Sequence, residues 1–363
     1  MARDYQMCTR CVMDTTDPLI TFDENGVCNH CTRYLAQMDQ FILPEEDRMR
    51  KLEHMVAEIK EHGKGKPYDC VAGISGGADS SYMVYKATEY GLRPLAVHLD
   101  NGWDSRLAVT NIERVLNKLG VDLYTHVIDW EEFKDLQQAY FESSVIDIEV
   151  ASDHAIAALI RNITAKKGMK YILGGTNYAT EGIMPRSWVW TKNDLTNLKD
   201  IHSKFGKRKL KTYPMLGFLG LVYLRKIKGI RTLPFLNYID YNREEAKRFL
   251  KEKLGWEDYG GKHHESIFTK FYQSFILPTK FNIDKRKAHL STMICSGQID
   301  RAYALKELEK PLYDEQELKR DTEYVRKKFG WSEEDFERIM SLPVKRHDDY
   351  KTDLWIRKLL GAN

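Results

Sequence analysis

The chain has 363 residues, of which 42% are hydrophobic and 30% charged, a composition typical of a globular protein. Its formal net charge of +3 is too close to balance to indicate nucleic-acid binding by itself. No segment approaches the roughly 20 apolar residues that cross a bilayer, and the first residues lack a signal-peptide core, so we expect a cytoplasmic protein.

Four of the six cysteines lie near the N-terminus, as Cys8 with Cys11 and Cys28 with Cys31. Each pair has the Cys-x2-Cys spacing of knuckles that close a tetrahedral zinc site. A reducing compartment favours metal over disulfides, although a disulfide pair or an iron site is an alternative. Because four thiolates leave no open coordination position, we expect structural zinc in a zinc-ribbon segment at residues 1–43.

Residues 44–67 are predicted to form a packing helix followed by a short linker. Pro44 favours the helix start and Gly63 its end, and Leu52, Met55 and Val56 fall on one face. The two remaining cysteines, Cys70 and Cys295, are expected to be small buried hydrophobic residues.

From residue 68 onward, apolar strands alternate with amphipathic helices. Strands are predicted at 68–74, 94–99, 123–128 and 170–173, and helices at 80–90, 107–119, 131–141 and 153–167. This alternation predicts an α/β fold with a doubly wound parallel sheet that binds ligands at the carboxyl ends of its strands. We assign residues 68–200 to this core, 201–283 to a substrate or partner region, and 284–363 to a helical C-terminal region.

The first strand leads into its helix through Ser-Gly-Gly-Ala-Asp-Ser-Ser at residues 75–81. Glycines let the backbone approach a ligand, and the free N–H groups and dipole of a helix start attract anions, so a phosphate chain fits there. Asp79 in the first helical turn would assist an anion only through a cation such as Mg²⁺. An ordinary capped helix start is the alternative.

Two further loops are expected at the same edge of the sheet. Asp100 and Asn101, ahead of Trp103, place polar groups where an adenosine would lie, although a plain turn explains them too. The loop at residues 174–182 resembles the Gly-Thr-x5-Glu segment of NAD synthetase, which implies that Thr176 lies near the nucleotide and Glu181 binds a metal. A solvated loop carboxylate is the alternative for Glu181.

Residues 202–231 contain nine Lys or Arg and no Asp or Glu, around an apolar run at 215–224. Three interpretations remain open: a basic rim for an anionic substrate, a peripheral membrane or partner contact at residues 215–228, and a buried helix with snorkelling lysines.

Residues 260–266, Gly-Gly-Lys-His-His-Glu-Ser, have the composition of a site loop that enters a helix. His263 could relay a proton near neutral pH, although an ordinary surface histidine fits equally well. Substrate contacts are expected in these loops, from Trp103, Asn177, Lys262, His263, Glu265 and Ser266.

The residues at 75–81 resemble the pyrophosphate loop of the N-type ATP pyrophosphatases. Together with the cysteine knuckles, Asp-Asn-Gly-Trp at 100–103, and Asp-Lys-Arg-x-Ala-His-Leu-Ser at 284–291, the chain resembles the N-acetyl sugar amidotransferase family of bacterial surface-glycan biosynthesis. The resemblance implies ATP as cosubstrate, Asp79 and Glu181 as magnesium ligands, and catalytic roles for Asp79, Glu181 and His263. It places the nucleotide against Gly73, Ile74, Ser75, Gly76, Gly77, Asp79, Ser80, Ser81, Asp100, Asn101 and Thr176.

The resemblance also implies the reaction. An acetamido group becomes an acetamidino group, on a nucleotide-linked or nonulosonic sugar for O-antigen or pseudaminic acid. No cysteine lies in a recognisable glutaminase triad, so ammonia should come from a separate glutaminase and cyclase-type subunit, and no nucleic acid is expected as partner. The alternatives are a tRNA thiolase with the same adenylation chemistry and an inactive zinc-ribbon protein that binds nucleic acid.

Overall fold

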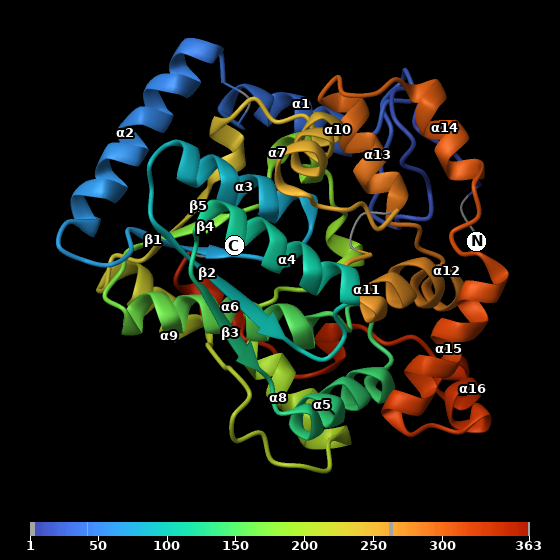
Figure 1. Cartoon of the computed structure of the whole chain (residues 1–363). Helices are drawn as coiled ribbons and strands as arrows, with labels where there is room; N and C mark the ends of the chain where they lie inside the picture. The colour runs from blue at the N-terminus through green and yellow to red at the C-terminus, as the bar shows by residue number, and fades with distance from the viewer. Residues whose placement is uncertain (1–3, 42, 261–263, 362–363) are drawn as a thin grey trace.

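A computed structural model describes residues 4–41, 43–260 and 264–361 and contains a parallel sheet of five strands in the order β3-β2-β1-β4-β5 (Figure 1). The strands are β1 (Cys70–Gly73), β2 (Pro94–Asp100), β3 (Leu123–Val127), β4 (Tyr171–Gly174) and β5 (Arg231–Pro234). Chain order reverses between β1 and β4, which are neighbours with Val71 opposite Ile172. This confirms the predicted doubly wound sheet, and its ligand crevice is expected where the order reverses.

Helices cover both faces of the sheet. On one face α3 (Ala78–Glu89) lies against β1, β2 and β4, beside α4 (Arg106–Leu119) and the long α2 (Glu45–Gly63). On the other face α6 (Val150–Lys166) contacts the same three strands and packs on α5 (Trp130–Ser143), which contacts α8 (Leu195–Phe205). The central strands β1, β2 and β4 are almost wholly buried, as sequence runs without polar alternation predict.

Local signals set the helix ends close to the predicted bounds. The side chain of Ser105 accepts a hydrogen bond from Ala108 N at the start of α4, and Gly120 ends that helix with φ +63°. Asp129 caps α5 through the N–H groups of Glu131 and Glu132. In α2, Leu52, Met55, Val56 and Ile59 are buried, so its expected apolar face faces the core.

The edge strand β5 was not predicted. Its four residues, Arg231-Thr232-Leu233-Pro234, contain one aliphatic side chain and follow the basic stretch, so they carry little strand signal. The strand is exposed or half-buried along its length and lies at the sheet edge, where proline is tolerated. The sheet therefore extends past residue 200, the boundary we predicted for the core.

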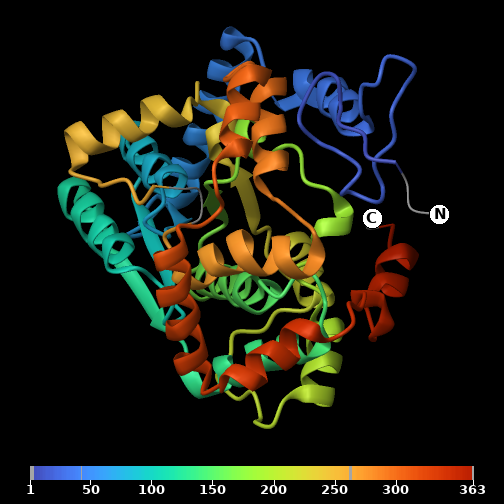
Figure 2. The same ribbon diagram turned by 90° about the vertical axis from the view of Figure 1, so that its right-hand side faces the viewer.

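The N-terminal segment folds as short loops with bridges between Met7 and Asp14 and between Phe22 and Cys28. It continues into α1 (Asn29–Phe41), a helix that the zinc-ribbon prediction did not include. The C-terminal helices hold this segment in place, because Val12 N donates to Ser291 Oγ and Arg301 donates to the carbonyls of Cys8 and Cys11. Figure 2 shows the segment, in dark blue, to the right of the orange helices.

The remainder of the chain is mainly helical, as predicted for residues 284–363. Short helices of the middle region are α7 (Tyr178–Glu181), α9 (Phe218–Lys226), α10 (Arg243–Phe249), α11 (Ile267–Phe271) and α12 (Leu277–Phe281), with 3-10 turns at Arg186–Trp188, Phe235–Tyr238 and His347–Asp349 and π-helical turns at Leu250–Leu254 and Tyr272–Ile276. The C-terminal helices are α13 (Arg286–Cys295), α14 (Arg301–Glu309), α15 (Glu315–Phe329), α16 (Glu333–Ser341) and α17 (Leu354–Leu359).

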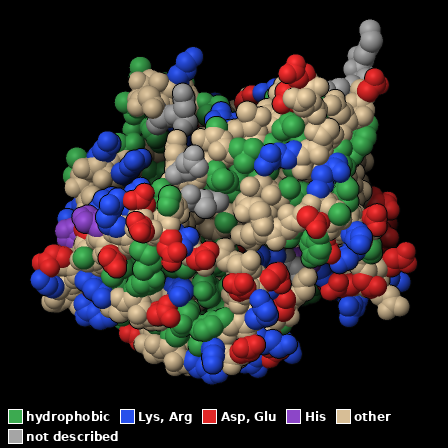
Figure 3. All heavy atoms as spheres, turned by 90° about the horizontal axis from the view of Figure 1, so that it is seen from above, with side chains coloured by type: hydrophobic (Ala, Val, Ile, Leu, Met, Phe, Trp, Pro, Cys, Tyr) green, Lys and Arg blue, Asp and Glu red, His purple; other side chains and the backbone are tan. Residues whose placement is uncertain are grey.

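The apolar run at 215–224 does not form a buried helix. In α9 only Leu224 is buried, whereas Leu219 and Tyr223 are exposed and Ile227, just after it, is 71% exposed. The interpretation of α9 as an ordinary core helix is therefore wrong. A basic rim for an anionic substrate and a membrane or partner contact at residues 215–228 both stay predictions. Within the described ranges, no helix is both long and apolar enough to span a bilayer. Acidic and basic side chains are interspersed on the face shown in Figure 3.

Candidate functional site

A cavity of about 580 Å³ opens at the carboxyl ends of β1, β2 and β4, at the reversal of strand order. Several residues singled out from the sequence line it: Gly73, Ile74, Ser75, Gly77, Asp79, Ser80, Asn101, Thr176, Glu181, Glu265 and Ser266. The first and third predicted loops, far apart in sequence, therefore meet at one site.

The glycine turn after β1 has a geometry that only glycine satisfies. Gly76 has φ +79°, and a Cβ there would lie 2.5 Å from the carbonyl oxygen of Ala108. The buried indole of Trp256 donates its Nε1–H to the Gly76 carbonyl at 2.8 Å and fixes the turn from behind. Gly76 and Ser81 do not line the cavity: Gly76 packs on α4 and Ser81 is fully buried, so both support the loop rather than contact a ligand.

The start of α3 presents backbone donors to the cavity. Ala78 N donates to the Tyr259 hydroxyl at 3.2 Å, and Gly77 N to Ser75 Oγ at 3.3 Å. These acceptors are neutral hydroxyls beside the positive end of a helix of twelve residues. Phosphate oxygens are better acceptors for such donors, so the arrangement suits an anionic group.

Asp79 and Glu181, the predicted magnesium ligands, both lie near Tyr241. The Tyr241 hydroxyl donates to Asp79 Oδ1, and the pKa of Tyr241 is raised well above its usual value by burial and by the charge of Asp79, with a further contribution from Glu181. Two carboxylates that face one cavity beside the glycine turn are the type of ligand that Mg²⁺ uses. Magnesium itself stays a prediction.

The second loop contributes less than expected. Asn101 lines the cavity, but Asp100 accepts the Gly102 N–H at 2.9 Å and is absent from the lining, so it shapes the turn. Trp103 is fully buried and donates its indole N–H to Gln137 Oε1 at 2.8 Å. Its assignment as a substrate contact is corrected to a core residue, because a large aromatic side chain in an Asp-Asn-Gly turn gives no signal of its orientation.

His98, on β2, is a cavity residue that the sequence did not identify as such. Its Nδ1 lies 3.0 Å from the Ile74 carbonyl and its Nε2 lies 3.1 Å from Asp104 Oδ2. Burial disfavours the charged imidazolium, but the Asp104 carboxylate outweighs burial and raises the pKa of His98 above its usual value. A histidine inside an apolar strand run, next to a strand end, was the available signal.

A helix cap fixes the conformation of the third loop, residues 174–182. Asn177 accepts the Thr180 N–H at 2.9 Å and is buried, so its assignment as a substrate contact is corrected to the cap of α7. Gly175 lies against the start of α3, where a Cβ would be 3.3 Å from Ser80 Cα. Thr176 and Glu181 flank the cap and remain on the cavity wall.

The C-terminal part of the chain supplies the opposite wall. Asp104 and Ser266 form an antiparallel bridge, and Ser75 Oγ donates to Glu265 Oε1 at 3.4 Å, so this segment lies directly over the glycine turn. Lys262 and His263, predicted as substrate contacts, and with them the catalytic role proposed for His263, lie outside the described residues.

A second group of polar side chains, four of them charged, lines the cavity farther from the glycine turn and was not identified from the sequence. It comprises Glu149, Asp153, Lys192, Gln273 and Lys285. Lys285 falls within the Asp-Lys-Arg run noted at residues 284–286, which was the only available signal. Glu149 immediately precedes α6 and Asp153 lies in its first turn. In the sequence, both therefore look like the ordinary acidic start of an amphipathic helix.

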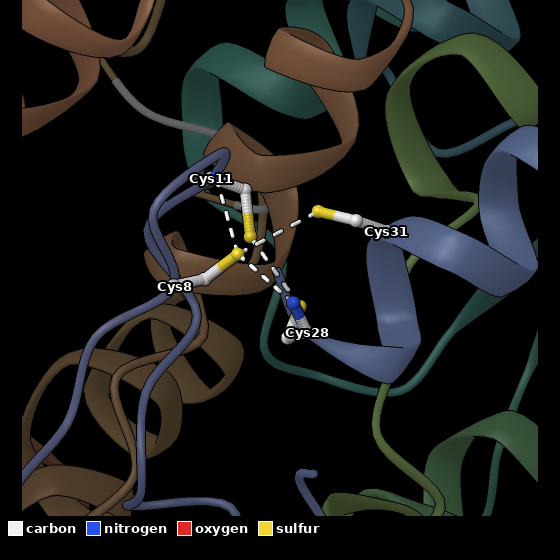
Figure 4. Close-up of side chains that lie close together, drawn as sticks. All are labelled: Cys8, Cys11, Cys28 and Cys31. Carbon is white, nitrogen blue, oxygen red and sulfur yellow. Dashed lines mark hydrogen bonds between the residues drawn. The ribbon is translucent and has the colours of Figure 1, made fainter. Parts of the chain in front are cut away.

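The four N-terminal cysteines converge on one point (Figure 4). Their sulfurs all lie within 4.8 Å of one another, with Cys8 Sγ 3.9 Å from Cys31 Sγ and Cys11 Sγ 3.7 Å from Cys28 Sγ. A tetrahedral ion with bonds of about 2.3 Å to sulfur has sulfur–sulfur edges of about 3.8 Å. Four buried thiols with this spacing fit zinc and contradict the disulfide alternative, because all are free.

Cys70 is buried in β1, as expected for a small hydrophobic residue. Cys295, at the end of α13, is also buried, but its Sγ lies 3.6 Å from Cys31 Sγ. It therefore contacts the cysteine cluster directly, which its position in the sequence gave no reason to expect. Neither Cys70 nor Cys295 lines the cavity.

A comparison with protein-family models finds a match for the C-terminal part of the chain. Residues 265–360 match the model of a family described as LPS biosynthesis protein WbpG-like, C-terminal domain. This match confirms, over those residues, the predicted relationship to surface-glycan biosynthesis proteins. The matched segment begins at Glu265, on the cavity wall. No curated protein matches the chain.

Among solved structures, the chain is similar to NMN synthetase from Francisella tularensis, with 14% identity over 63% of this chain and 93% of that one, at a TM-score of 0.31. NH3-dependent NAD synthetase from Campylobacter jejuni has 15% identity over 59% of this chain and 94% of that one, at a TM-score of 0.30. A predicted tRNA methyltransferase subunit from Methanocaldococcus jannaschii has 13% identity over 50% of this chain and 75% of that one, at a TM-score of 0.28. Because these TM-scores are low, the fold assignment rests on the strand order of the chain itself.

Proposed function

We propose that the chain is an ATP-dependent, AMP-forming amidotransferase that converts the acetamido group of a sugar into an acetamidino group in bacterial surface-glycan biosynthesis. One observation carries the proposal: the glycine turn at 75–81 and the WbpG-like C-terminal region line the same cavity. In this proposal the glycine turn binds the phosphates of ATP, and the WbpG-like region on the other wall binds the sugar. The shared cavity therefore suits a reaction between ATP and a sugar.

On the nucleotide side, Ser75, Gly77 and Ser80 surround the pyrophosphate of ATP in this proposal. Asp79 and Glu181 would hold Mg²⁺, which when bound neutralises the charge of the phosphates. Tyr241 keeps the Asp79 carboxylate in place through its hydroxyl. Preorganised donors of the α3 start would stabilise the charge that develops on the leaving pyrophosphate.

The proposed chemistry has two steps. The acetamido oxygen attacks the α-phosphorus of ATP, forming an O–P bond while the bond to the β-phosphate oxygen breaks and pyrophosphate leaves with the electron pair. Ammonia then adds to the activated carbon and gives up one proton, AMP departs with the former amide oxygen and the electron pair of the C–O bond, and an amidinium product remains. Adenylation is needed because an amide oxygen is a poor leaving group.

Ammonia would be supplied by a separate glutaminase subunit. All six cysteines lie away from the cavity, four in the metal cluster, one in β1 and one beside Cys31, so none is placed as a glutaminase nucleophile there. The same placement disfavours the tRNA thiolase alternative, whose sulfur chemistry uses cysteines near the adenylated base. The zinc assigned to the cluster has a structural role in this proposal.

Incubation with ATP, Mg²⁺, ammonium and UDP- or CMP-linked acetamido sugars tests the proposal. We expect AMP release that depends on the sugar, and a product about one mass unit lighter, because NH replaces O. AMP release that requires tRNA and a sulfur donor instead would establish the alternative, and absence of nucleotide binding would exclude both enzymes.

A matched pair of variants on α3 sharpens this test. Asp79→Asn removes a proposed magnesium ligand, so turnover should fall by at least a hundredfold, an effect of about 3 kcal/mol on the barrier. Glu89→Gln, at the far end of the same helix, removes an exposed pair with Lys86 and should leave turnover unchanged. Equal activity of Asp79→Asn and the parent protein would remove Asp79 from the mechanism.

A further inference from the structure

Four Lys or Arg side chains line the cavity, and they differ in whether a carboxylate balances their charge. Two are ion-paired with carboxylates of the same lining, as Lys192 with Asp153 at 3.0 Å and Lys285 with Glu149 at 3.2 Å. The other two, Arg161 on α6 and Arg243 at the start of α10, form no ion pair with any residue that the structure describes. Because charges removed from water are normally paired, these two arginines mark positions where the cavity can bind an anion.

Arg243 lies at the glycine-turn end of the cavity, since α10 packs on α3. Its positive charge acts on Tyr241, whose hydroxyl donates to Asp79, and on Tyr259, whose hydroxyl accepts from Ala78 N. Burial raises the pKa of both tyrosines, and the charge of Arg243 partly offsets that rise. An anion beside Arg243 also meets the start of α3, so this position suits the phosphates of ATP.

Arg161 lies on the other side of the sheet, because α6 and α3 pack on opposite faces. Its Nη1 donates to the Ala157 carbonyl at 3.0 Å, so the guanidinium leans towards the start of α6, where Glu149 and Asp153 also line the cavity. This is the one hydrogen bond that Arg161 makes within the described ranges. Its other N–H groups are therefore available to a ligand.

No carboxylate of the cavity balances Arg161. Burial alone shifts the pKa of Arg161, and it shifts the pKa downward. The lining contains six carboxylates, and none of them acts on that pKa: Asp79, Asp104, Glu149, Asp153, Glu181 and Glu265. A guanidinium stays charged at neutral pH even so, and a half-buried charge without a partner is unfavourable. An anionic ligand would remove this cost.

The basic stretch at residues 202–231 borders the Arg161 end of the cavity. Leu224 of α9 and Ile160, which precedes Arg161, belong to one hydrophobic cluster with Ile172 of β4. Thr232 of β5 pairs with Ile172 and lines the cavity. Three exposed cations at α9 have no carboxylate partner in the part of the chain that the structure describes: Arg225, Lys226 and Lys228. Their positive potential favours the approach of an anionic molecule from this side.

We propose that Arg161 binds an oxyanion of the acceptor, which is a carboxylate of the sugar or a phosphate of its nucleotide carrier. This proposal rests on the proposed function and deepens it. The phosphates of ATP lie between the glycine turn and Arg243, and the acceptor lies along α6, with its ring toward the WbpG-like wall and its anion at Arg161. The planar guanidinium donates two parallel hydrogen bonds to either kind of oxyanion. The acceptor is therefore an acidic sugar or a sugar nucleotide, and not a free neutral sugar.

Equilibrium binding to the full chain, measured by calorimetry with α,β-methylene-ATP present, tests this assignment. The probes are N-acetylneuraminate, UDP-N-acetylglucosamine, its uronate with a carboxylate at C6, UDP, and neutral N-acetylglucosamine. We expect at least one anionic acetamido sugar to bind about tenfold or more tightly than N-acetylglucosamine. Arg161→Met should raise the Kd of that sugar about tenfold to a hundredfold, the loss typical of hydrogen bonds between charged groups, and leave the Kd of the ATP analogue unchanged.

The probes also distinguish the two sources of the oxyanion. If Arg161 binds a carboxylate, Arg161→Met weakens N-acetylneuraminate and removes the difference in affinity between the uronate and UDP-N-acetylglucosamine. If Arg161 binds a phosphate, the variant weakens UDP and both UDP-sugars by the same factor. Either result supports an acceptor oxyanion at Arg161.

Three measurements separate binding from folding. Arg161→Met keeps an apolar stem and removes a charge without a carboxylate partner, so the melting temperature of the unliganded protein should not fall. Arg161→Lys keeps the charge but lacks the planar fork, so its affinity should be intermediate. Arg320→Met is the matched control, because Arg320 is exposed on α15 and is absent from the cavity lining, and it should bind every probe like the parent protein.

Several results would overturn the assignment. Unchanged affinity of Arg161→Met for every anionic probe would contradict it, and so would anionic sugars that bind no more tightly than N-acetylglucosamine. Weaker binding of the ATP analogue with normal acceptor binding would mean that Arg161 contacts the nucleotide instead. If the analogue fails to bind the parent protein, the proposed function is refuted, and the sugar probes measured without it still decide whether Arg161 binds their oxyanions.

Discussion

Tyr34 and Tyr178 exchange hydrogen bonds, each hydroxyl donating to the backbone carbonyl of the other residue. The Tyr178 hydroxyl lies 2.9 Å from Tyr34 O, the Tyr34 hydroxyl lies 3.3 Å from Tyr178 O, and the rings stack at 4.4 Å with an interplanar angle of 12°. Tyr34 follows Cys31 by three residues on α1, and Tyr178 begins α7, which ends at Glu181. The cysteine cluster is therefore linked through one residue pair to the loop that carries a proposed magnesium ligand.

Removing both hydroxyls should loosen that link without removing the metal. In the Tyr34→Phe, Tyr178→Phe double variant, two hydrogen bonds of about 1 kcal/mol each are lost while the rings still stack, so we expect ATP to bind roughly tenfold more weakly. Metal content should stay that of the parent protein. Tyr303→Phe, an exposed tyrosine on α14, is the control, and unchanged ATP affinity in the double variant would contradict the coupling.

The contact between Cys295 and Cys31 raises the question of which four sulfurs bind the metal. The four N-terminal thiols satisfy a tetrahedral site, so Cys295→Ala should keep about one zinc per chain, whereas Cys31→Ala should lose most of it. Metal analysis after gel filtration measures this. Loss of the ion from Cys295→Ala, with retention in Cys31→Ala, would make Cys295 the ligand in place of Cys31.

The sequence was sufficient for those parts of the fold where hydrophobic pattern and glycine position agree. The strands β1, β2 and β4 are buried apolar runs that end in glycine-rich or polar loops, so both their bounds and the site at their ends could be predicted. The edge strand β5 could not, because its pairing with β4 comes from tertiary contact and not from its own residues.

The charged part of the cavity wall could not be predicted for a different reason. Glu149 and Lys285 are 136 residues apart, and nothing local distinguishes them from solvated charges. Their burial depends on α6 and the start of α13 meeting across the cavity. The side-chain orientations of Trp103 and Asn177 could not be predicted either, although their loops were located correctly. Trp103 is buried in the core, and Asn177 caps α7.

Neighbouring glycines in the glycine turn at residues 75–81 should respond differently to substitution by alanine. At Gly76, φ is +79° and a Cβ would lie 2.5 Å from the Ala108 carbonyl oxygen, so Gly76→Ala should destabilise the protein by a few kcal/mol. At Gly77, φ is −69° and the nearest atoms are the Ser75 Oγ and the Tyr259 hydroxyl, both at 3.1 Å, on the cavity side. Gly77→Ala should therefore leave the melting temperature nearly unchanged and abolish ATP binding.

The control for this pair is Gly168→Ala, where φ is +66° and a Cβ would meet nothing within 4 Å. It isolates the cost of the left-handed conformation, about 1 kcal/mol. A Gly76→Ala variant no less stable than Gly168→Ala would show that the turn can move away from α4, and the proposed close fit would be wrong.

Stability should depend on pH through His347, a buried histidine that does not line the cavity. It is 6% exposed, its Nδ1 lies 2.8 Å from Asn197 Oδ1, and its ring stacks on Trp190 at 4.8 Å. Burial lowers the pKa of His347 to about 4 from its usual 6.5, an effect that outweighs the nearby charge of Asp147. The folded state therefore binds fewer protons than the unfolded state between these values, and stability rises with pH there.

The comparison with His347→Gln isolates this contribution, because Asp194 works in the opposite direction. Burial raises the pKa of Asp194 to about 6, which makes the folded protein lose stability as pH rises from about 4 to 6 and can mask the histidine in the parent protein alone. Urea unfolding of both proteins should show the parent gaining on the order of 3 kcal/mol over His347→Gln between pH 4 and 6.5, and no further gain above. His54→Gln, an exposed site on α2, should track the parent throughout. A constant difference between parent and His347→Gln across that window would mean that His347 is protonated as readily in the folded chain as in the unfolded one.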